Sequence, residues 1–150
     1  MKEFENIKNF IFDCDGVLYN DLEKVFGQVS RRMTSYISKK LNLDLKKAKE
    51  LQTNYFHKYN TSLNGLMIHH DINPNDFLKY VHEINLDFLE KDLFLREELI
   101  KLKAKKFVFT NGSHEHVANI TKHLGINDLF DGSFDITDCN FIPKPSIEPY

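Results

Sequence analysis

The sequence has few cysteines, almost no net charge and no long apolar run, and each shortage excludes a class of protein. Two cysteines, Cys14 and Cys139, are too few for the disulfide framework of a small secreted domain. The 20 basic and 22 acidic residues nearly cancel, so nucleic acid polymers and membranes are not expected partners. No apolar segment approaches the roughly 18 residues that a membrane-spanning helix needs.

The beginning of the sequence also lacks the basic-then-apolar layout of a signal peptide. We therefore expect a cytoplasmic protein with reduced thiols and a small, soluble substrate. A chain of 150 residues is long enough for one domain with a real core, or for a core with a small inserted cap.

Apolar periodicity predicts a short strand followed by four helices. The run at 8–12 has the β-favouring side chains of a buried strand. Apolar residues then recur every three or four positions, which predicts amphipathic helices. The expected helices run from Asp21 to Leu41, from an N-cap at Asp44 to about Tyr55, from 63 to 70, and from an N-cap at Asn73 to about Ile84. They indicate a single all-helical insertion, with 85–92 as the return linker.

After the insertion, helices and strands alternate. We expect a helix at 95–102, a strand at 106–110, a helix at 114–124 closed by Gly125, and a strand at about 133–136. Such alternation predicts an α/β fold with a Rossmann-like parallel sheet, in which the carboxyl ends of all strands meet at one edge. We assign residues 1–19 and 93–150 to this core and 20–92 to an all-helical cap.

Two aspartates follow the first expected strand. Asp13 and Asp15 are two positions apart, and on a strand such side chains project to the same side. Both carboxylates can therefore reach one site, while alternation turns Cys14 away from them toward the core and makes it an unlikely nucleophile. The alternative is a plain turn, because Asp15-Gly16 is a common turn signal.

Polar residues also end the second expected strand. Thr110, Asn111, Gly112 and Ser113 precede a helix whose first turn should offer unpaired N–H groups and the positive end of a dipole. This arrangement suits a phosphate group. The alternative is an ordinary helix cap formed by serine or glycine.

A lysine lies between two prolines near the end of the sequence. Pro143 and Pro145 restrict the backbone on both sides of Lys144, so we expect its ammonium group to point in one direction. The alternative is a solvated surface lysine. The order of these three polar segments, and their positions along the strand-helix alternation, favour a common site for a phosphate.

Together the segments resemble the haloacid dehalogenase superfamily. Its pattern is Asp-x-Asp after the first strand, Ser or Thr after the second, a later Lys and finally an acidic pair, and its cap matches the helical insertion. The resemblance covers essentially the whole chain. Segments 59–67, 81–82, 110–113 and 143–145 look most like the pyrimidine 5′-nucleotidase group, although Asn64 stands where many relatives have Arg.

The resemblance implies catalytic roles for the two aspartates. Asp13 would attack phosphorus and become an aspartyl phosphate. Asp15 would protonate the leaving alcohol and then activate water. Mg²⁺ would be held by the Asp13 carboxylate, the Asp15 carbonyl oxygen, waters and the substrate phosphate.

The remaining segments would bind the phosphate. Thr110 would donate a hydrogen bond to a phosphoryl oxygen, helped by backbone N–H groups near Asn111 and Gly112. Lys144 would offset negative charge on the nucleophile and on the transferring group.

The family also has a part that this sequence lacks. Its acidic pair follows a fourth strand, which pairs beside the first, and the sequence stops at Tyr150 before that point. Two more strand-helix units would be roughly sixty residues. We therefore expect an open edge and an uncovered face at 10–12, with marginal stability, self-association or completion by a separate polypeptide.

The expected function is hydrolysis of a phosphomonoester with magnesium, acting on a nucleoside 5′-monophosphate or a similar small phosphate ester. The alternative is an inactive fragment or interaction module without a complete metal site. A histidine metal site is not expected, because the histidines at 69–71 and 114–116 lie one or two positions apart and do not face each other on a helix. We expect His116 on its helix surface or behind the site.

Overall fold

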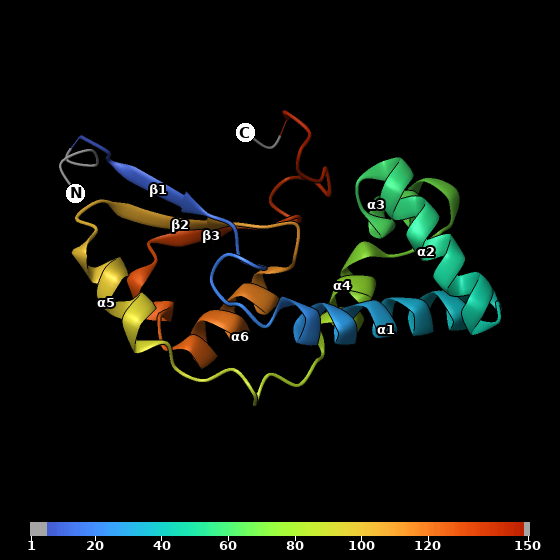
Figure 1. Ribbon diagram of the computed structural model, residues 1–150. Coiled ribbons are helices and arrows are strands. Elements are labelled where there is room, and N and C mark those ends of the chain that lie inside the picture. The colour runs from blue at the N-terminus through green and yellow to red at the C-terminus, as the bar shows by residue number, and fades with distance from the viewer. Residues whose placement is uncertain (1–5, 149–150) are drawn as a thin grey trace. The chain divides into compact units, whose positions relative to one another are not determined.

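The computed structural model describes residues 6–148, which form two compact units (Figure 1). The described residues of the first unit are 6–22 and 86–135, and those of the second are 23–85 and 136–148. The first unit contains all the strands of the described chain, and the second contains four helices. The outermost residues of the expected core, 1–5 and 149–150, lie outside the described residues.

The first unit is built on a parallel sheet of three strands in the order β1-β2-β3. The strands are β1 (Asn9–Phe12), β2 (Lys105–Phe109) and β3 (Gly132–Phe134). In this register Ile11 lies opposite Phe107, and Val108 lies opposite Ser133. The expected α/β class with a Rossmann-like parallel sheet is confirmed, and the carboxyl ends of the strands meet at one edge.

Two helices, α5 (Leu93–Lys101) and α6 (His114–Leu124), connect the strands and lie on the same side of the sheet (Figure 1). Right-handed crossovers that move in one direction along a sheet place their helices on one face. Helix α6 ends at Gly125, whose φ of 70° is left-handed and suits a residue without Cβ, as predicted. A short 3₁₀ helix, η2 (Asn127–Leu129), follows and was not predicted.

The sheet is less buried than its sequence suggests. The strand predicted at 8–12 is confirmed as β1, but its expected burial is wrong, because the Ile11 side chain is 66% exposed. Ile11 lies on an edge strand and faces away from α5 and α6, and on the same face Phe134 is 53% exposed. The expected open edge and uncovered face are therefore present in the described part of the chain.

The second unit consists of helices joined by short turns. They are α1 (Leu22–Leu41), α2 (Leu45–Tyr59), α3 (Ser62–His69) and α4 (Pro74–His82). The Asp44 side chain accepts a hydrogen bond from the Lys47 amide at 2.9 Å, and Asn73 caps α4 in the same way. Both predicted N-caps are confirmed.

Close packing and a few polar contacts hold these helices together. A Cβ added at Gly65 of α3 would lie 2.4 Å from Cγ of Tyr55, so the two helices approach too closely for any larger residue. Arg32 of α1 donates to the Tyr80 carbonyl oxygen at 2.6 Å and pairs with Glu83 at 2.6 Å. Both close steric packing and charged hydrogen bonds therefore stabilise the unit.

Residues 83–92 form no regular element and return the chain to the sheet, as the predicted linker at 85–92 requires. At the end of this linker the Asp92 side chain accepts from the Leu95 amide at 2.8 Å and starts α5. The Asp92 amide donates to the Leu124 carbonyl oxygen at 3.0 Å, which ties the linker to the end of α6. None of the helices in residues 6–148 has the length and apolar character to cross a membrane.

Candidate functional site

Each strand of the sheet is followed directly by a polar residue at the carboxyl edge. These residues are Asp13 after β1, Thr110 after β2 and Asp135 after β3. The Thr110 amide donates to the Phe134 carbonyl oxygen at 3.1 Å, so the ends of β2 and β3 lie side by side. Ligands of open parallel sheets bind at this edge, which makes it the candidate site.

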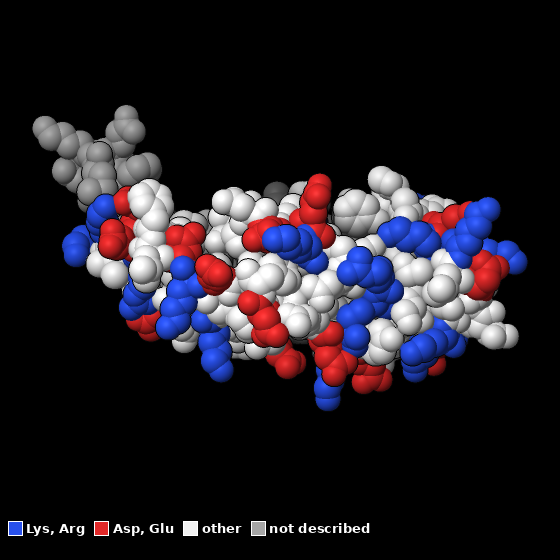
Figure 2. Space-filling view, turned by 60° about the horizontal axis from the view of Figure 1, so that its bottom comes forward, with Lys and Arg blue, Asp and Glu red and all other residues white. Residues whose placement is uncertain are grey.

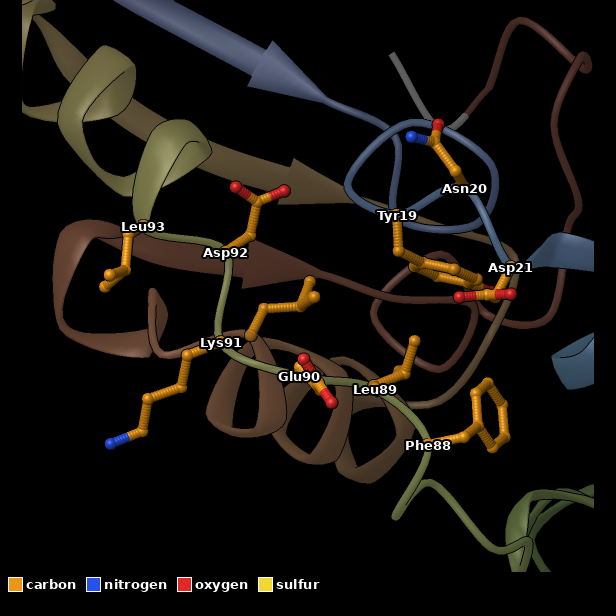
Figure 3. A pocket seen from close by; sticks show the side chains of 10 residues that line it. Tyr19, Asn20, Asp21, Phe88, Leu89, Glu90, Lys91, Asp92 and Leu93 are labelled. Atoms are coloured by element: carbon orange, nitrogen blue, oxygen red, sulfur yellow. The ribbon is translucent and has the colours of Figure 1, made fainter.

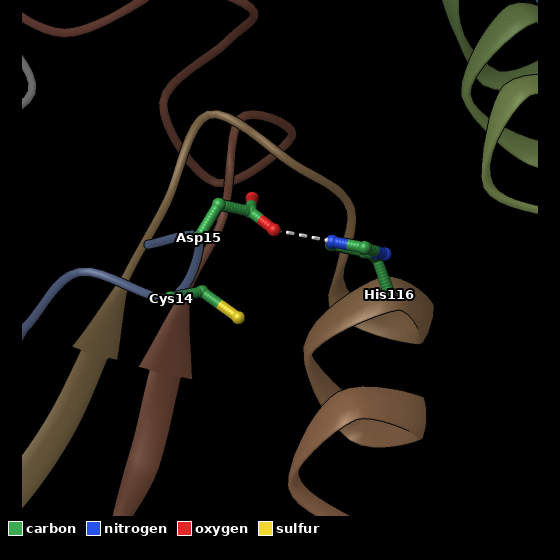
Figure 4. A group of neighbouring side chains, drawn as sticks. All are labelled: Cys14, Asp15 and His116. Carbon is green, nitrogen blue, oxygen red and sulfur yellow. Dashed lines mark hydrogen bonds and ion pairs between the residues drawn. The ribbon is translucent and has the colours of Figure 1, made fainter. Parts of the chain in front are cut away.

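The two predicted aspartates differ in their surroundings. Asp13 is exposed, and its Oδ1 accepts from the Cys14 amide at 2.7 Å. Oδ1 of Asp15 accepts from the Tyr19 hydroxyl at 2.5 Å. It also accepts from Nε2 of His116 at 2.8 Å, as Figure 4 shows. Because a carboxylate oxygen can only accept, both partners are donors.

The charges of Asp13 and Asp15 both affect the pKa of the Tyr19 hydroxyl. Burial raises the pKa of Tyr19, the charge of Asp15 and its hydrogen bond raise it further, and Cys14 and Asp13 add smaller effects. Tyr19 is only 5% exposed. Its hydroxyl therefore keeps its proton at neutral pH and remains a donor to Asp15.

His116 reaches Asp15 because of its position in α6. The buried face of this helix carries His116, Val117, Ile120, Thr121 and Leu124, with helical spacing. The His116 side chain is 2% exposed and that of Asp15 is 18% exposed. Of the two positions expected for His116, the one behind the site is confirmed and the one on the helix surface is wrong. The spacing of 116, 120 and 124 was the signal that could have decided between them.

Cys14 is fully buried, as predicted, but it is not turned away from Asp15. Its Sγ, an oxygen of Asp15 and a ring nitrogen of His116 all lie within 4.8 Å of one another (Figure 4). Side chains alternate in direction only along a strand, and β1 ends at Phe12, before Cys14. The two aspartates lie in the following turn, where Gly16 has a φ of 75°.

The chemistry of the ligand atoms at the site separates two kinds of metal ion. The group of Cys14, Asp15 and His116 combines sulfur, oxygen and nitrogen, a set that suits zinc better than magnesium, but Nε2 of His116 donates its proton to Asp15 and has no lone pair left for a metal. Mg²⁺ requires oxygen ligands and usually retains several waters. The exposed carboxylate of Asp13 fits that requirement, since it is a hard oxygen donor open to solvent.

Backbone N–H groups in and after the turn that follows β2 are already engaged in hydrogen bonds to nearby side chains. Thr110 is 1% exposed, and its Oγ1 accepts from the Gly112 amide at 2.9 Å. The Ser113 side chain accepts from the His116 amide at 3.3 Å, which makes Ser113 the N-cap of α6. The phosphate-binding roles of Thr110, Asn111 and Gly112 remain predictions, and for Gly112 this hydrogen bond would have to be shared or released.

Asp135 is a residue of this edge that sequence reasoning missed. Its side chain is 2% exposed, and its Oδ2 accepts from the His114 amide, the first of α6, at 2.5 Å. A carboxylate is stabilised at a helix N-terminus. The expected unpaired N–H groups of the first turn are therefore already bonded at His114 and His116. Asp13 and Thr110 were singled out because each directly follows a strand at the carboxyl edge of the sheet. Asp135 has the same position after β3.

Lys144, the last predicted site residue, lies between Pro143 and Pro145 in the second unit. The other predicted residues of the site belong to the first unit. The proposed contact of Lys144 with the phosphate remains a prediction.

A pocket of about 480 Å³ lies in the first unit and shares Tyr19 with the site (Figure 3). Its walls come from residues 19–21, 88–93 and Leu124. Asp21, Glu90 and Asp92 outnumber Lys91 among its charged residues, so it disfavours a phosphate. On the molecular face in Figure 2, acidic and basic side chains are interspersed and neither sign dominates.

Comparison with known proteins gives the site its family context. Residues 7–150 match the family of haloacid dehalogenase-like hydrolases. The chain is 35% identical over 146 residues to Phosphate metabolism protein 8 of Saccharomyces cerevisiae, covering 89% of this chain and 44% of that protein. It therefore spans less than half the length of this curated relative.

A solved structure supports the fold. The HAD phosphatase of Thermococcus onnurineus superposes with a TM-score of 0.52 at 18% identity, over 89% of this chain and 64% of that one. This level of identity supports the fold alone. On the strength of the family match over nearly its whole length, the chain belongs to the haloacid dehalogenase-like hydrolase family.

Proposed function

We propose that the protein hydrolyses small phosphate monoesters through an aspartyl phosphate on Asp13, with Mg²⁺ as cofactor. The observation that carries this proposal is the pair of carboxylates after β1. Asp13 is exposed at the carboxyl edge of the sheet, and Asp15 is held there by two buried donors. One group is thus accessible for attack on phosphorus and the other is oriented for proton transfer.

The reaction has two transfers. An oxygen of Asp13 bonds to phosphorus while the bond from phosphorus to the ester oxygen breaks, and Asp15 gives its proton to that oxygen. Water then attacks phosphorus and passes a proton to Asp15, and the bond to Asp13 breaks to release phosphate. The hydrogen bond from the Cys14 amide to Oδ1 of Asp13 orients the nucleophile.

The Asp13 carboxylate and the Asp15 backbone carbonyl oxygen would hold the Mg²⁺ ion. Bound there, the cation supplies positive charge that offsets the charge of the phosphate. In the same proposal Thr110, the turn at Asn111 and Gly112, and Lys144 bind the phosphoryl oxygens.

We propose a nucleoside 5′-monophosphate or a similar small ester as the substrate, with residues 20–92 forming the cap over a core of 1–19 and 93–150. The resemblance of segment 59–67 to pyrimidine 5′-nucleotidases supports this choice, and the name of the yeast relative concerns phosphate metabolism. A cytoplasmic location, the lack of a nucleic acid partner and self-association remain predictions.

The test is an assay of phosphate release from 4-nitrophenyl phosphate and from nucleoside 5′-monophosphates, with and without Mg²⁺. The wild-type chain would be compared with Asp13→Asn and with a control, Glu98→Gln, which loses only an exposed ion pair to Lys101. We expect turnover that needs Mg²⁺, a loss of at least about 1,000-fold in Asp13→Asn and no change in Glu98→Gln.

The competing function is a non-catalytic interaction module that keeps Asp13, Asp15 and Thr110 without hydrolysing a phosphate ester. A version of the chain extended by the yeast relative's C-terminal segment decides between them. Activity in either form that depends on Asp13 supports the hydrolase. No activity in either form, with both folded, would favour the module.

A further inference from the structure

We propose that His116 and Tyr19 are positioning residues that hold the Asp15 side chain so that its Oδ2 passes a proton to the leaving oxygen. This inference rests on the proposed function, because it assigns Asp15 the general acid role. It adds two residues that have no assigned part in the reaction. Neither is proposed to touch the substrate.

The geometry of the three side chains is the first support. Both donors bond to the same oxygen, with 2.5 Å from the Tyr19 hydroxyl to Oδ1 and 2.8 Å from Nε2 of His116 to Oδ1. They approach from different segments, because Tyr19 is in the turn after β1 and His116 is on α6 (Figure 4 shows the latter contact). Two donors from independent directions restrict both torsions of a short carboxylate side chain.

Burial of the two donors is the second support. Tyr19 is 5% exposed and His116 is 2% exposed, so packing restricts their own rotamers. The start of α6 is in turn anchored by the side chains of Ser113 and Asp135, which accept from the amides of His116 and His114. The position of Nε2 is therefore set by a rigid frame instead of by a mobile surface side chain.

The consequence concerns the other oxygen of Asp15. The hydrogen bonds from Tyr19 and His116 both end on Oδ1, so they orient the carboxyl group through that oxygen. In the first transfer the O–H bond at Oδ2 breaks, a bond forms to the ester oxygen, and the bond from that oxygen to phosphorus breaks. A carboxyl group that rotates freely spends less time aligned for this transfer.

A purely structural role predicts a different kinetic result. Proton donation matters most for a poor leaving group, such as the alcohol of an alkyl or nucleoside phosphate. It matters little for 2,4-dinitrophenolate, which leaves without a proton. Damage to folding or substrate binding would lower both rates together. The ratio kcat/KM reports only the steps through departure of the leaving group, so it isolates this transfer.

The experiment measures kcat/KM for a nucleoside 5′-monophosphate and for 2,4-dinitrophenyl phosphate, using the form of the protein that turns over. The variants are Tyr19→Phe, His116→Leu, the double variant, and His116→Gln, which keeps an N–H donor. The control is Thr121→Val, which removes a buried hydroxyl of α6 that bonds to the Val117 carbonyl oxygen instead of to Asp15. Thermal unfolding followed by circular dichroism checks each fold.

We expect His116→Leu to lose about 10- to 100-fold with the nucleotide and less than about 3-fold with the dinitrophenyl ester. Tyr19→Phe should show the same selectivity with a smaller loss, and His116→Gln should recover part of the nucleotide activity. Thr121→Val should leave the ratio of the two substrates unchanged. If His116→Leu does not fold, Tyr19→Phe and His116→Gln decide the matter.

Equal losses with both substrates would overturn this inference and leave the proposed function intact. A folded wild-type protein that hydrolyses neither ester, in the original or the extended form, would overturn the proposed function and this inference with it. The two failures are therefore distinguishable.

Discussion

Two buried tyrosines, one in each unit, occupy opposite kinds of environment. Tyr19 in the sheet unit donates its hydroxyl proton to Asp15, whereas the Tyr36 hydroxyl in the helical unit has no hydrogen-bond partner among residues 6–148. The Tyr36 ring instead packs edge-on against Phe77, with ring centres 5.2 Å apart. The hydroxyl of one buried tyrosine supports a carboxylate, whereas the ring of the other packs against an aromatic side chain.

This contrast separates a buried hydroxyl group that supports the site from one without a hydrogen-bond partner among residues 6–148. Buried polar groups that serve a site must be matched by partners, and such networks specify one arrangement. Apolar contacts tolerate more variation but depend on shape. Substitutions that create a steric clash should therefore be most damaging in the helical unit. Substitutions that remove a hydrogen-bond donor should be most damaging near Asp15.

The largest expected effect on stability comes from the packing of α2 against α3. Gly65→Ala should destabilise the protein by about 2–3 kcal/mol, because the new methyl group would meet Tyr55 at 2.4 Å. Gly27→Ala in α1 is the matched control, since its nearest atom would be 3.5 Å away. We expect it to stabilise by up to about 1 kcal/mol. Urea unfolding of both variants measures the difference, and equal effects would contradict the packing account.

The next effect contrasts the two tyrosines. Tyr19→Phe removes a hydrogen bond to a charged group and should cost about 1.5–3 kcal/mol. Tyr36→Phe removes a buried hydroxyl without a partner and should be neutral or stabilise by about 1 kcal/mol. The same urea titrations give both values. A destabilisation by Tyr36→Phe as large as that by Tyr19→Phe would remove the distinction between the units.

The smallest effect is a dependence on alkaline pH. Burial, with a smaller contribution from Asp76, raises the pKa of Tyr36 above its usual value of about 10. The unfolded chain then loses this proton at lower pH than the folded chain does, so stability is retained below about pH 10 and falls as the pH rises above it. Tyr36→Phe should remove part of this fall, as measured by urea unfolding between neutral and alkaline pH. An unchanged fall would show that other groups cause it.

The features predicted correctly from the sequence are those set by neighbouring residues. The caps at Asp44 and Asn73 and the end of α6 at Gly125 each depend on one residue and the turn beside it. The strands and their parallel orientation were predicted from the alternation of helices and strands. Local signals of this kind do not require knowledge of what packs against the element.

The features that sequence reasoning missed depend on distant parts of the chain. A place for His116 behind the site was one of two expectations, but its hydrogen bond to Asp15, 101 residues away, follows from no local pattern. The exposure of Ile11 depends on what covers the sheet, and a strand's apolar content alone cannot reveal that. Asp135 was missed although the strand-end rule applied to it, because it was treated as part of the third strand.

The most direct test of the central claim is to trap the acyl phosphate. The protein would be mixed with substrate and Mg²⁺, quenched in acid, reduced with borohydride and analysed by peptide mass spectrometry. The account predicts that reduction converts Asp13, and no other aspartate, to homoserine in wild-type protein, and that omitting substrate prevents it. Turnover without such modification, or modification at a different carboxylate, would contradict the assignment of Asp13 as the nucleophile.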